Sequence, residues 1–184
     1  EHLLTTETPN IDQVISILKK RVICGDLLSK KAIEVLTQLL FRTGEPKGIT
    51  ILLTHAGRNQ PLPKSVDELL RQIYYGQVLE YSQHLGSLNK ATKKLRDSTS
   101  QGKLLCTSVL NLIVRQLKSA DRQALLMPIL VNVVSNGQSL DKKRHRPVLE
   151  EIFLETVDAP STDLIEIFTY LTRQNQIISD EIIV

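Results

Sequence analysis

The residue types that most often carry metal chemistry are few in this chain and far apart. Its four histidines and two cysteines are His2, His55, His84, His145, Cys24 and Cys106. Zinc sites usually take pairs of such ligands from within a few residues of each other, and no pair of that kind occurs here. The spacing therefore predicts no metal site.

Phosphate and nucleophile motifs are also incomplete. Gly102-Lys103 matches only the end of a Walker A loop, because Asp97 stands in place of its first glycine and Leu104 in place of the magnesium-binding hydroxyl. No Gly-x-Ser-x-Gly elbow occurs. The acid pairs Asp67-Glu68 and Glu150-Glu151 stand in the first turns of expected helices, where they complement the helix dipole. We therefore expect no enzymatic activity and no cofactor.

Lysine and arginine gather in two clusters. The basic helix cluster lies on an expected short helix and consists of Lys90, Lys93, Lys94 and Arg96. The spacing of its three lysines places them on one helical face. The basic loop cluster lies between two expected helices and consists of Lys142, Lys143, Arg144 and Arg146, with His145 inside the run.

Basic runs of this kind serve nuclear import, contact with nucleic acid or binding to an acidic protein. The simpler alternative for both clusters is a solvated surface. For the loop cluster, pairing with Glu150, Glu151 or Glu155 is a further alternative. If the loop cluster binds a partner or an import receptor, its four cations should be exposed and unpaired within the domain.

Charge is divided unevenly along the chain. The whole chain carries 23 Lys and Arg against 20 Asp and Glu, a net charge of +3. Residues 1–146 contain 22 basic and 12 acidic residues, whereas residues 147–184 contain Arg173 and eight acids. The net charges of these segments are thus +10 and −7, and they predict a basic surface for an acidic partner.

Composition favours a folded intracellular protein. Leu, Ile and Val make up 60 of the 184 residues, enough apolar surface to offset the entropy of ordering. Cys24 and Cys106 lie in apolar helical patterns and are expected to be buried thiols. No Asn-x-Ser/Thr sequon occurs, and the chain opens at Glu1 without an apolar leader. We expect part of a longer protein from a reducing compartment, with the nucleus favoured over the cytoplasm.

Apolar residues recur at helical spacing through the whole chain. Ser29, Ser65, Ser119 and Ser161 are expected as N-caps. Residues 104–117 are apolar almost all round, which predicts a central buried helix. The expected core of this helix and the next is Leu105, Leu110, Leu112, Ile113, Leu126, Leu130 and Val134.

The pattern predicts an all-α fold of nine or ten short antiparallel helices. Helix pairs recur every 35–45 residues or so, which is typical of an irregular α-solenoid of the HEAT or armadillo kind. A compact helical bundle is the alternative. We expect one domain over residues 1–184. If there are two lobes, we expect their boundary near residues 97–102, because that polar tract is expected to be a loop.

Two hypotheses of function follow. The first is a non-enzymatic interaction or scaffold module of a larger intracellular complex, which binds a protein along a groove. The second is a nucleic-acid-binding domain that uses the clusters at 90–96 and 142–146. Base stacking would need exposed aromatics, and at least two of Tyr74, Tyr75 and Tyr81 are expected in the core. No membrane span and no small-molecule substrate are expected.

Overall fold

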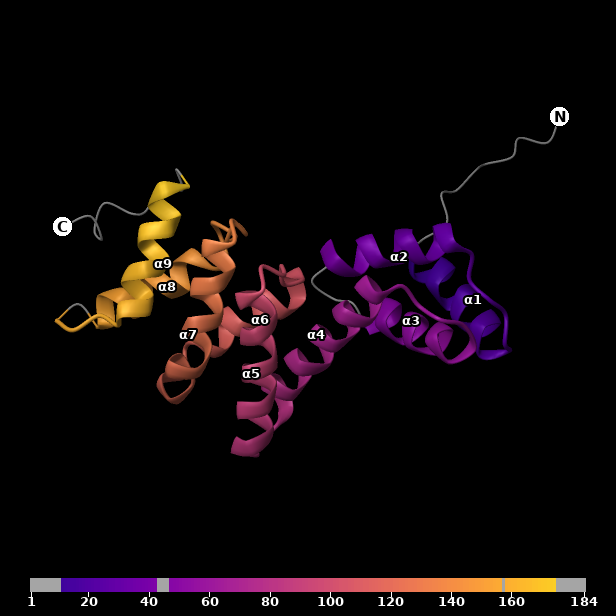
Figure 1. Ribbon diagram of the computed structural model, residues 1–184, viewed down its shortest axis with the longest axis horizontal. Helices are drawn as coiled ribbons and strands as arrows, with labels where there is room; N and C mark the ends of the chain where they lie inside the picture. Colours follow the sequence, from indigo (N-terminus) through magenta and orange to yellow (C-terminus); the bar gives the residue numbers. More distant parts are fainter. Residues whose placement is uncertain (1–10, 43–46, 157, 175–184) are drawn as a thin grey trace. The chain divides into compact units, whose positions relative to one another are not determined.

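The computed structural model describes residues 11–42, 47–156 and 158–174, and these residues form nine helices and no strand (Figure 1). The helices are α1 (Ile11–Ile23), α2 (Lys30–Arg42), α3 (Lys47–Asn59), α4 (Lys64–Tyr81), α5 (Leu85–Ser100), α6 (Thr107–Gln116), α7 (Ala120–Ser135), α8 (Arg146–Glu155) and α9 (Thr162–Arg173). The prediction of an all-α fold is confirmed for this part of the chain. The helix expected over 104–117 begins only at Thr107.

The chain divides into two compact units, Glu1–Leu70 and Arg71–Val184, so the division falls within α4 and not near residues 97–102. The polar tract expected there as a loop is helical as far as Ser100. Thr99 is fully buried, and its hydroxyl donates to the carbonyl of Leu95 at 3.1 Å. A hydroxyl satisfied by its own helix no longer competes with helix formation, which is why the loop prediction was wrong.

Each unit packs a helix against the second helix after it. In the N-terminal unit α1 packs on α3, and in the C-terminal unit α5 packs on α7 and α7 on α9. Helix α6 contacts both α7 and α8. All seven residues expected in the core are buried, with exposed fractions of 8% or less. The predicted core of α6 and α7 is therefore confirmed.

The two units repeat the same helix ending 77 residues apart, at Gly25 and Gly102. These glycines follow α1 and α5 with φ of 98° and 81°, a region that L side chains rarely adopt. In each case the glycine N–H and the next N–H donate back to the last helical turn, to Val22 and Arg21 after α1 and to Thr99 and Ser98 after α5. Such a reversal ends the helix and sends the chain back along it.

Side-chain amides then join each of these turns to a later helix in the same way. Asn59 donates to the carbonyl of Val22 at 2.7 Å, and Asn136 donates to that of Thr99 at 2.7 Å. Asn59 and Asn136 are again 77 residues apart, as are Val22 and Thr99. The agreement shows that α1–α3 and α5–α7 are built on one plan.

A glutamine completes the plan by pairing with a buried leucine of the loop. Gln60 accepts from the N–H of Leu28 at 2.7 Å and donates to its carbonyl at 3.1 Å. Gln138 does the same to Leu105, at 2.9 and 2.6 Å. Because a buried backbone group without a partner is costly, each amide allows its loop to bury a leucine.

Three of the four serines expected as N-caps hold that position. Ser29 and Ser161 accept from the N–H groups of Ala32 and Leu164 at 3.2 and 3.3 Å, as expected of N-caps. Ser65 lies inside α4, which begins at Lys64. Ser119 holds the N-cap position, but its hydroxyl bonds to the Asp121 carboxylate and not to the helix N–H groups. The N-cap prediction is therefore confirmed in position for Ser119 and wrong for Ser65, where the carbonyl of Pro63 accepts from the N–H groups of Val66 and Asp67 instead.

The central core yields a first prediction. Leu112→Ala should lower the free energy of unfolding by about 2–5 kcal/mol, because it removes packed methyl groups and leaves a cavity. Leu154, which is 46% exposed, provides the matched control. Leu154→Ala should cost less than about 1 kcal/mol in the same urea denaturation experiment. Equal losses in both variants would contradict the burial of Leu112.

Candidate functional site

The basic helix cluster occupies the solvent face of α5. Lys90, Lys93, Lys94 and Arg96 are all exposed, as their spacing predicts. The opposite face buries Ala91, Thr92 and Leu95. Among the described residues none of the four cations forms an ion pair. Their charge is therefore available to an anionic partner.

The basic loop cluster is a folded turn organised by Asp141. One carboxylate oxygen of Asp141 accepts from the N–H groups of Lys143 and Arg144 at 2.8 and 2.9 Å. The carbonyl of Asp141 accepts from the N–H groups of His145 and Arg146. The two N–H bonds to the carboxylate hold the pKa of Asp141 below its usual value. The turn thus stays closed while Asp141 is ionised.

His145 locks the turn to α6. Its ring is buried, Nδ1 accepts from the N–H of Asp141 at 3.0 Å, and Nε2 lies 2.6 Å from Oδ1 of Asn111. Since Nδ1 accepts, the proton is on Nε2, which donates to Asn111. Burial lowers the pKa of His145, so the neutral imidazole is favoured.

The fold of the turn leaves three of the four cations of the basic loop cluster exposed and buries the fourth. Lys142, Lys143 and Arg144 are exposed, but Arg146 begins α8 and is only 7% exposed. The prediction that all four cations face solvent is therefore wrong for Arg146. Glu151 pairs with Lys118 at 3.0 Å and not with the cluster. Three cations remain on the surface of a fixed turn.

The tyrosines of α4 are more exposed than expected. Tyr74 and Tyr81 are 61% and 69% exposed, although at least two of the three tyrosines were expected in the core. Seven residues separate them, so both lie on one face of α4. Tyr74 also packs edge-on against Tyr75, with ring centroids 5.5 Å apart. Exposed aromatic rings are thus present in the C-terminal unit.

The cysteines differ from each other. Cys106 is fully buried at the start of α6, and burial raises the pKa of its thiol. Cys24 is exposed, because it follows the last turn of α1 just before the Gly25 reversal. The expected burial is therefore confirmed for Cys106 and wrong for Cys24. Burial thus favours the neutral thiol at Cys106.

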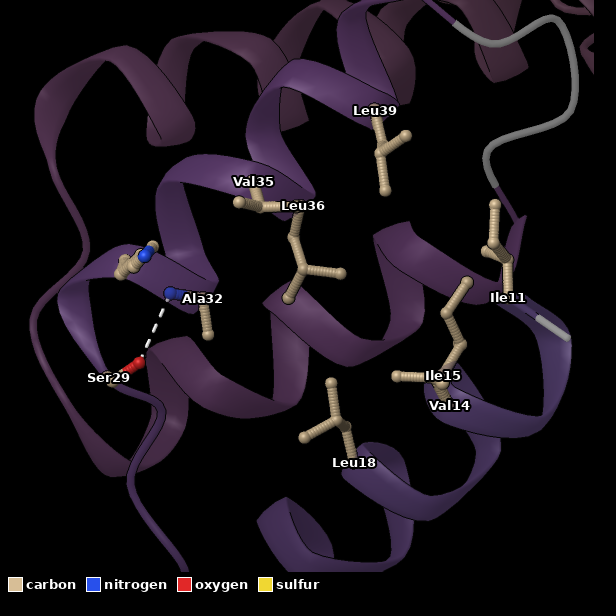
Figure 2. A pocket seen from close by; sticks show the side chains of 10 residues that line it. Ile11, Val14, Ile15, Leu18, Ser29, Ala32, Val35, Leu36 and Leu39 are labelled. Atoms are coloured by element: carbon tan, nitrogen blue, oxygen red, sulfur yellow. Dashed lines mark hydrogen bonds between the residues drawn. The ribbon is translucent and has the colours of Figure 1, made fainter. Parts of the chain in front are cut away.

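An apolar groove lies between α1 and α2, at a place that the sequence did not indicate. Its volume is about 470 Å³. Its lining consists of Ile11, Val14, Ile15, Leu18, Ser29, Lys31, Ala32, Val35, Leu36 and Leu39. Figure 2 shows Ile15 and Leu18 of α1 and Leu36 and Leu39 of α2 around a shared hollow. We call this feature the α1–α2 groove.

The groove exists because α1 buries so little. Val22 is the buried residue of this helix, whereas Ile11, Ile17 and Ile23 are 58–60% exposed. A helix with apolar residues on several faces normally packs on several neighbours. Within the described residues of the N-terminal unit, α1 packs chiefly on α3. The sequence signal for the groove was this excess of apolar positions over available neighbours.

The described residues hold no group of three His, Cys, Asp or Glu side chains that could bind a metal ion. No helix among them has both the length and the hydropathy needed to cross a bilayer. Within the described ranges, the α1–α2 groove offers apolar contact and the two clusters offer contact with cations.

Comparison with protein-family models, curated proteins and solved structures finds no match to this chain. The site must therefore be interpreted from its own geometry.

The burial of His145 predicts a pH dependence of stability. The folded-state pKa of His145 lies below the unfolded value of about 6.5, so only the unfolded chain gains this proton near that pH. The free energy of unfolding should therefore fall as the pH drops from about 7 through 6.5 and on to the folded-state pKa. The lowered pKa of Asp141 adds a loss only below about 4. Urea denaturation should show a flatter profile between about pH 7 and 5.5 for His145→Gln, and identical profiles would contradict this prediction.

The loop cluster gives a third prediction. Replacing Lys142, Lys143 and Arg144 together with alanine should change the free energy of unfolding by less than about 0.5 kcal/mol per site, because all three are exposed. Arg146→Ala should cost about 1–3 kcal/mol, because it removes a buried stem from the start of α8. Thermal denaturation of both variants checks the difference. A loss above about 1.5 kcal/mol in the triple variant, or no loss in Arg146→Ala, would contradict it.

Proposed function

We propose that this chain is a non-enzymatic protein–protein interaction module of a larger intracellular complex, with the nucleus favoured as its location. The observation that carries the proposal is the α1–α2 groove, whose apolar lining faces solvent. A stable monomer rarely exposes a contiguous apolar surface of this kind without a binding role. An apolar groove between two helices also suits recognition of a partner helix.

The architecture that we propose for this module is an irregular α-solenoid of the HEAT or armadillo kind. The contacts between alternate helices, α1 with α3, α5 with α7 and α7 with α9, support it. The plan repeated at 77 residues, with a glycine reversal and an amide-bound leucine in each copy, supports it further. Solenoids offer extended surfaces to partner proteins, which agrees with the proposed role.

A second candidate function is nucleic-acid binding by the C-terminal unit. The specific observation in its favour is the set of exposed groups there: four cations on α5, three on the Asp141 turn, and the exposed rings of Tyr74 and Tyr81. Cations contact phosphates without sequence preference, and exposed rings stack on unpaired bases. These groups would act independently of the α1–α2 groove.

Size-exclusion chromatography of the tagged chain in cell extract distinguishes the two functions. A protein-interaction module should elute in an assembly larger than the chain itself, both before and after nuclease treatment. The assembly should persist between about 50 and 300 mM salt, because apolar contacts respond weakly to ionic strength. Elution at the mass of the free chain in every condition would contradict the proposal.

A matched variant tests the second candidate. Replacing Lys90, Lys93, Lys94 and Arg96 with alanine changes only exposed residues, so the fold should be kept. A nucleic-acid binder should lose affinity for single-stranded oligonucleotide on this change, and its salt dependence should become shallower. An assembly that nuclease dissolves and this variant cannot form would favour nucleic-acid binding over protein interaction.

A further inference from the structure

The repeated plan shows what covers the counterpart of the α1–α2 groove in the C-terminal unit. There, α4 packs on α6 at Gly76, where an added Cβ would lie 3.2 Å from Val109 and 3.5 Å from Leu112. Val109 and Leu112 correspond, 77 residues on, to Ala32 and Val35 of α2. Those two residues line the groove. The surface that is open in the N-terminal unit is thus covered by a helix in the C-terminal unit.

The same helix also bonds to the loop before α6. Gln72 is buried and lies one turn before Gly76 in α4. Its amide donates to the carbonyl of Leu104 at 3.1 Å and accepts from the N–H of Cys106 at 3.3 Å. The corresponding groups before α2 are the carbonyl of Leu27 and the N–H of Ser29. Among the described residues neither of these two groups has a hydrogen-bond partner.

We propose that the α1–α2 groove binds one amphipathic helix of a separate protein, seated on α2 as α4 is seated on α6; the proposal rests on the function proposed above. The bound helix carries a Gln or Asn that pairs with Leu27 and Ser29. One turn later it carries a small or medium side chain over Ala32. Its apolar face fills the space between Ile15, Leu18 and Leu39.

The depth of the groove determines the size of the side chain that the bound helix carries over Ala32. Ala32 lacks the two γ-carbons of Val109, and Val35 has one methylene fewer than Leu112. The space over α2 is therefore deeper than the space that Gly76 occupies over α6. A residue larger than glycine fits there, because close packing of the interface rewards filled volume.

The lysines beside the groove determine which charge the bound helix carries next to its apolar face. Lys30 and Lys31 open α2, no acid lies in its first turn, and Lys31 lines the groove. Cations at a helix N-terminus are opposed by the helix dipole. Among the described residues neither lysine forms an ion pair. A carboxylate on the bound helix would offset this repulsion, so the partner is acidic beside its apolar face.

A second copy of this chain is a poorer occupant. The matching face of α4 already packs on α6 of its own copy, through Gln72 and Gly76. The apolar face of α9 is likewise internal, with Leu164, Ile167 and Leu171 buried. A second copy could therefore offer either helix face only by opening its own core.

The helix that covers the counterpart surface supplies the probe. A fluorescent synthetic peptide with the sequence of residues 64–81 and Gly76→Ala is titrated against the full chain by fluorescence anisotropy. Alanine suits the deeper groove and is a better helix former than glycine. Saturable binding below about 1 mM is expected, and its absence would overturn the proposal.

Variants of the protein locate the bound peptide. Val35→Asp and Val14→Asp should each weaken binding about tenfold or more, because a charge is placed in an apolar contact. Ile51→Asp on α3 is the matched control, since Ile51 lies outside the groove and is 40% exposed, against 49% for Val35 and 37% for Val14. The control should bind within about twofold of the wild type. Equal loss in all three variants would overturn the groove as the site.

Variants of the peptide test how it is seated. Replacing Gln72 with alanine in the peptide should weaken binding about five- to tenfold, because the loop groups of Leu27 and Ser29 lose their partner. Replacing Gln77, which is exposed in α4, should leave the affinity unchanged. If the two replacements have the same effect, the seating copied from α4 is wrong.

Other occupants give distinct outcomes. Tighter peptide binding by the full-length double variant Leu3→Asp, Leu4→Asp would show that residues 1–10 fill the groove, and would overturn the proposal. Sedimentation showing a dimer that Val35→Asp dissolves would do the same in favour of a second copy. If Val35→Asp leaves the assembly in cell extract intact, the groove proposal fails while the interaction-module proposal stands. If the wild-type chain elutes without an assembly in cell extract but still binds the peptide, the interaction-module proposal alone fails.

Discussion

The structure depends on one repeated interaction, the pairing of a side-chain amide with the backbone of a buried loop leucine. Leu28 and Leu105 point into the core from loops, where no helix can satisfy their N–H and C=O groups. Gln60 and Gln138 supply both missing bonds to these leucines. Since a buried unsatisfied group costs about 1–3 kcal/mol, losing either amide would release its leucine as well as two hydrogen bonds. Each glutamine thereby holds the end of a later helix, α3 or α7, against the loop that contains its leucine.

The same interaction shows where the two units differ. The loop before α6 is held from both sides, by Gln138 and by Gln72, and α4 covers α6 where Gly76 allows close approach. The loop before α2 is held by Gln60 alone among the described residues. An apolar groove lies on the side of α2 that corresponds to the covered side of α6. One structural plan, complete in one unit and incomplete in the other, accounts for the groove without any special sequence motif.

The helices and the core could be predicted from local sequence, because the helical periodicity of leucine and the positions of glycine are signals contained within a few neighbouring residues. It failed where partners lie far apart in the chain. The Gln60–Leu28 pair spans 32 residues and the Asn136–Thr99 pair 37, and nothing near an Asn or Gln signals such a bond. Arg146 looked like its basic neighbours, yet the turn built by Asp141 places it at the buried start of α8. The groove was missed because an apolar helix face looks alike whether a neighbour covers it or not.

The apolar groove and the exposed cations have different physical effects on association. Exposed charges act over about 8–10 Å at physiological salt, so they raise the rate of encounter with an acidic partner. Apolar side chains act only in contact, and they slow dissociation by excluding water. Lys30 and Lys31 stand next to the groove, whereas the α5 cations belong to the other unit. For an acidic amphipathic helix, the groove would therefore determine residence time and the lysines beside it the approach. Replacing these lysines should slow association, and replacing Val35 should speed dissociation.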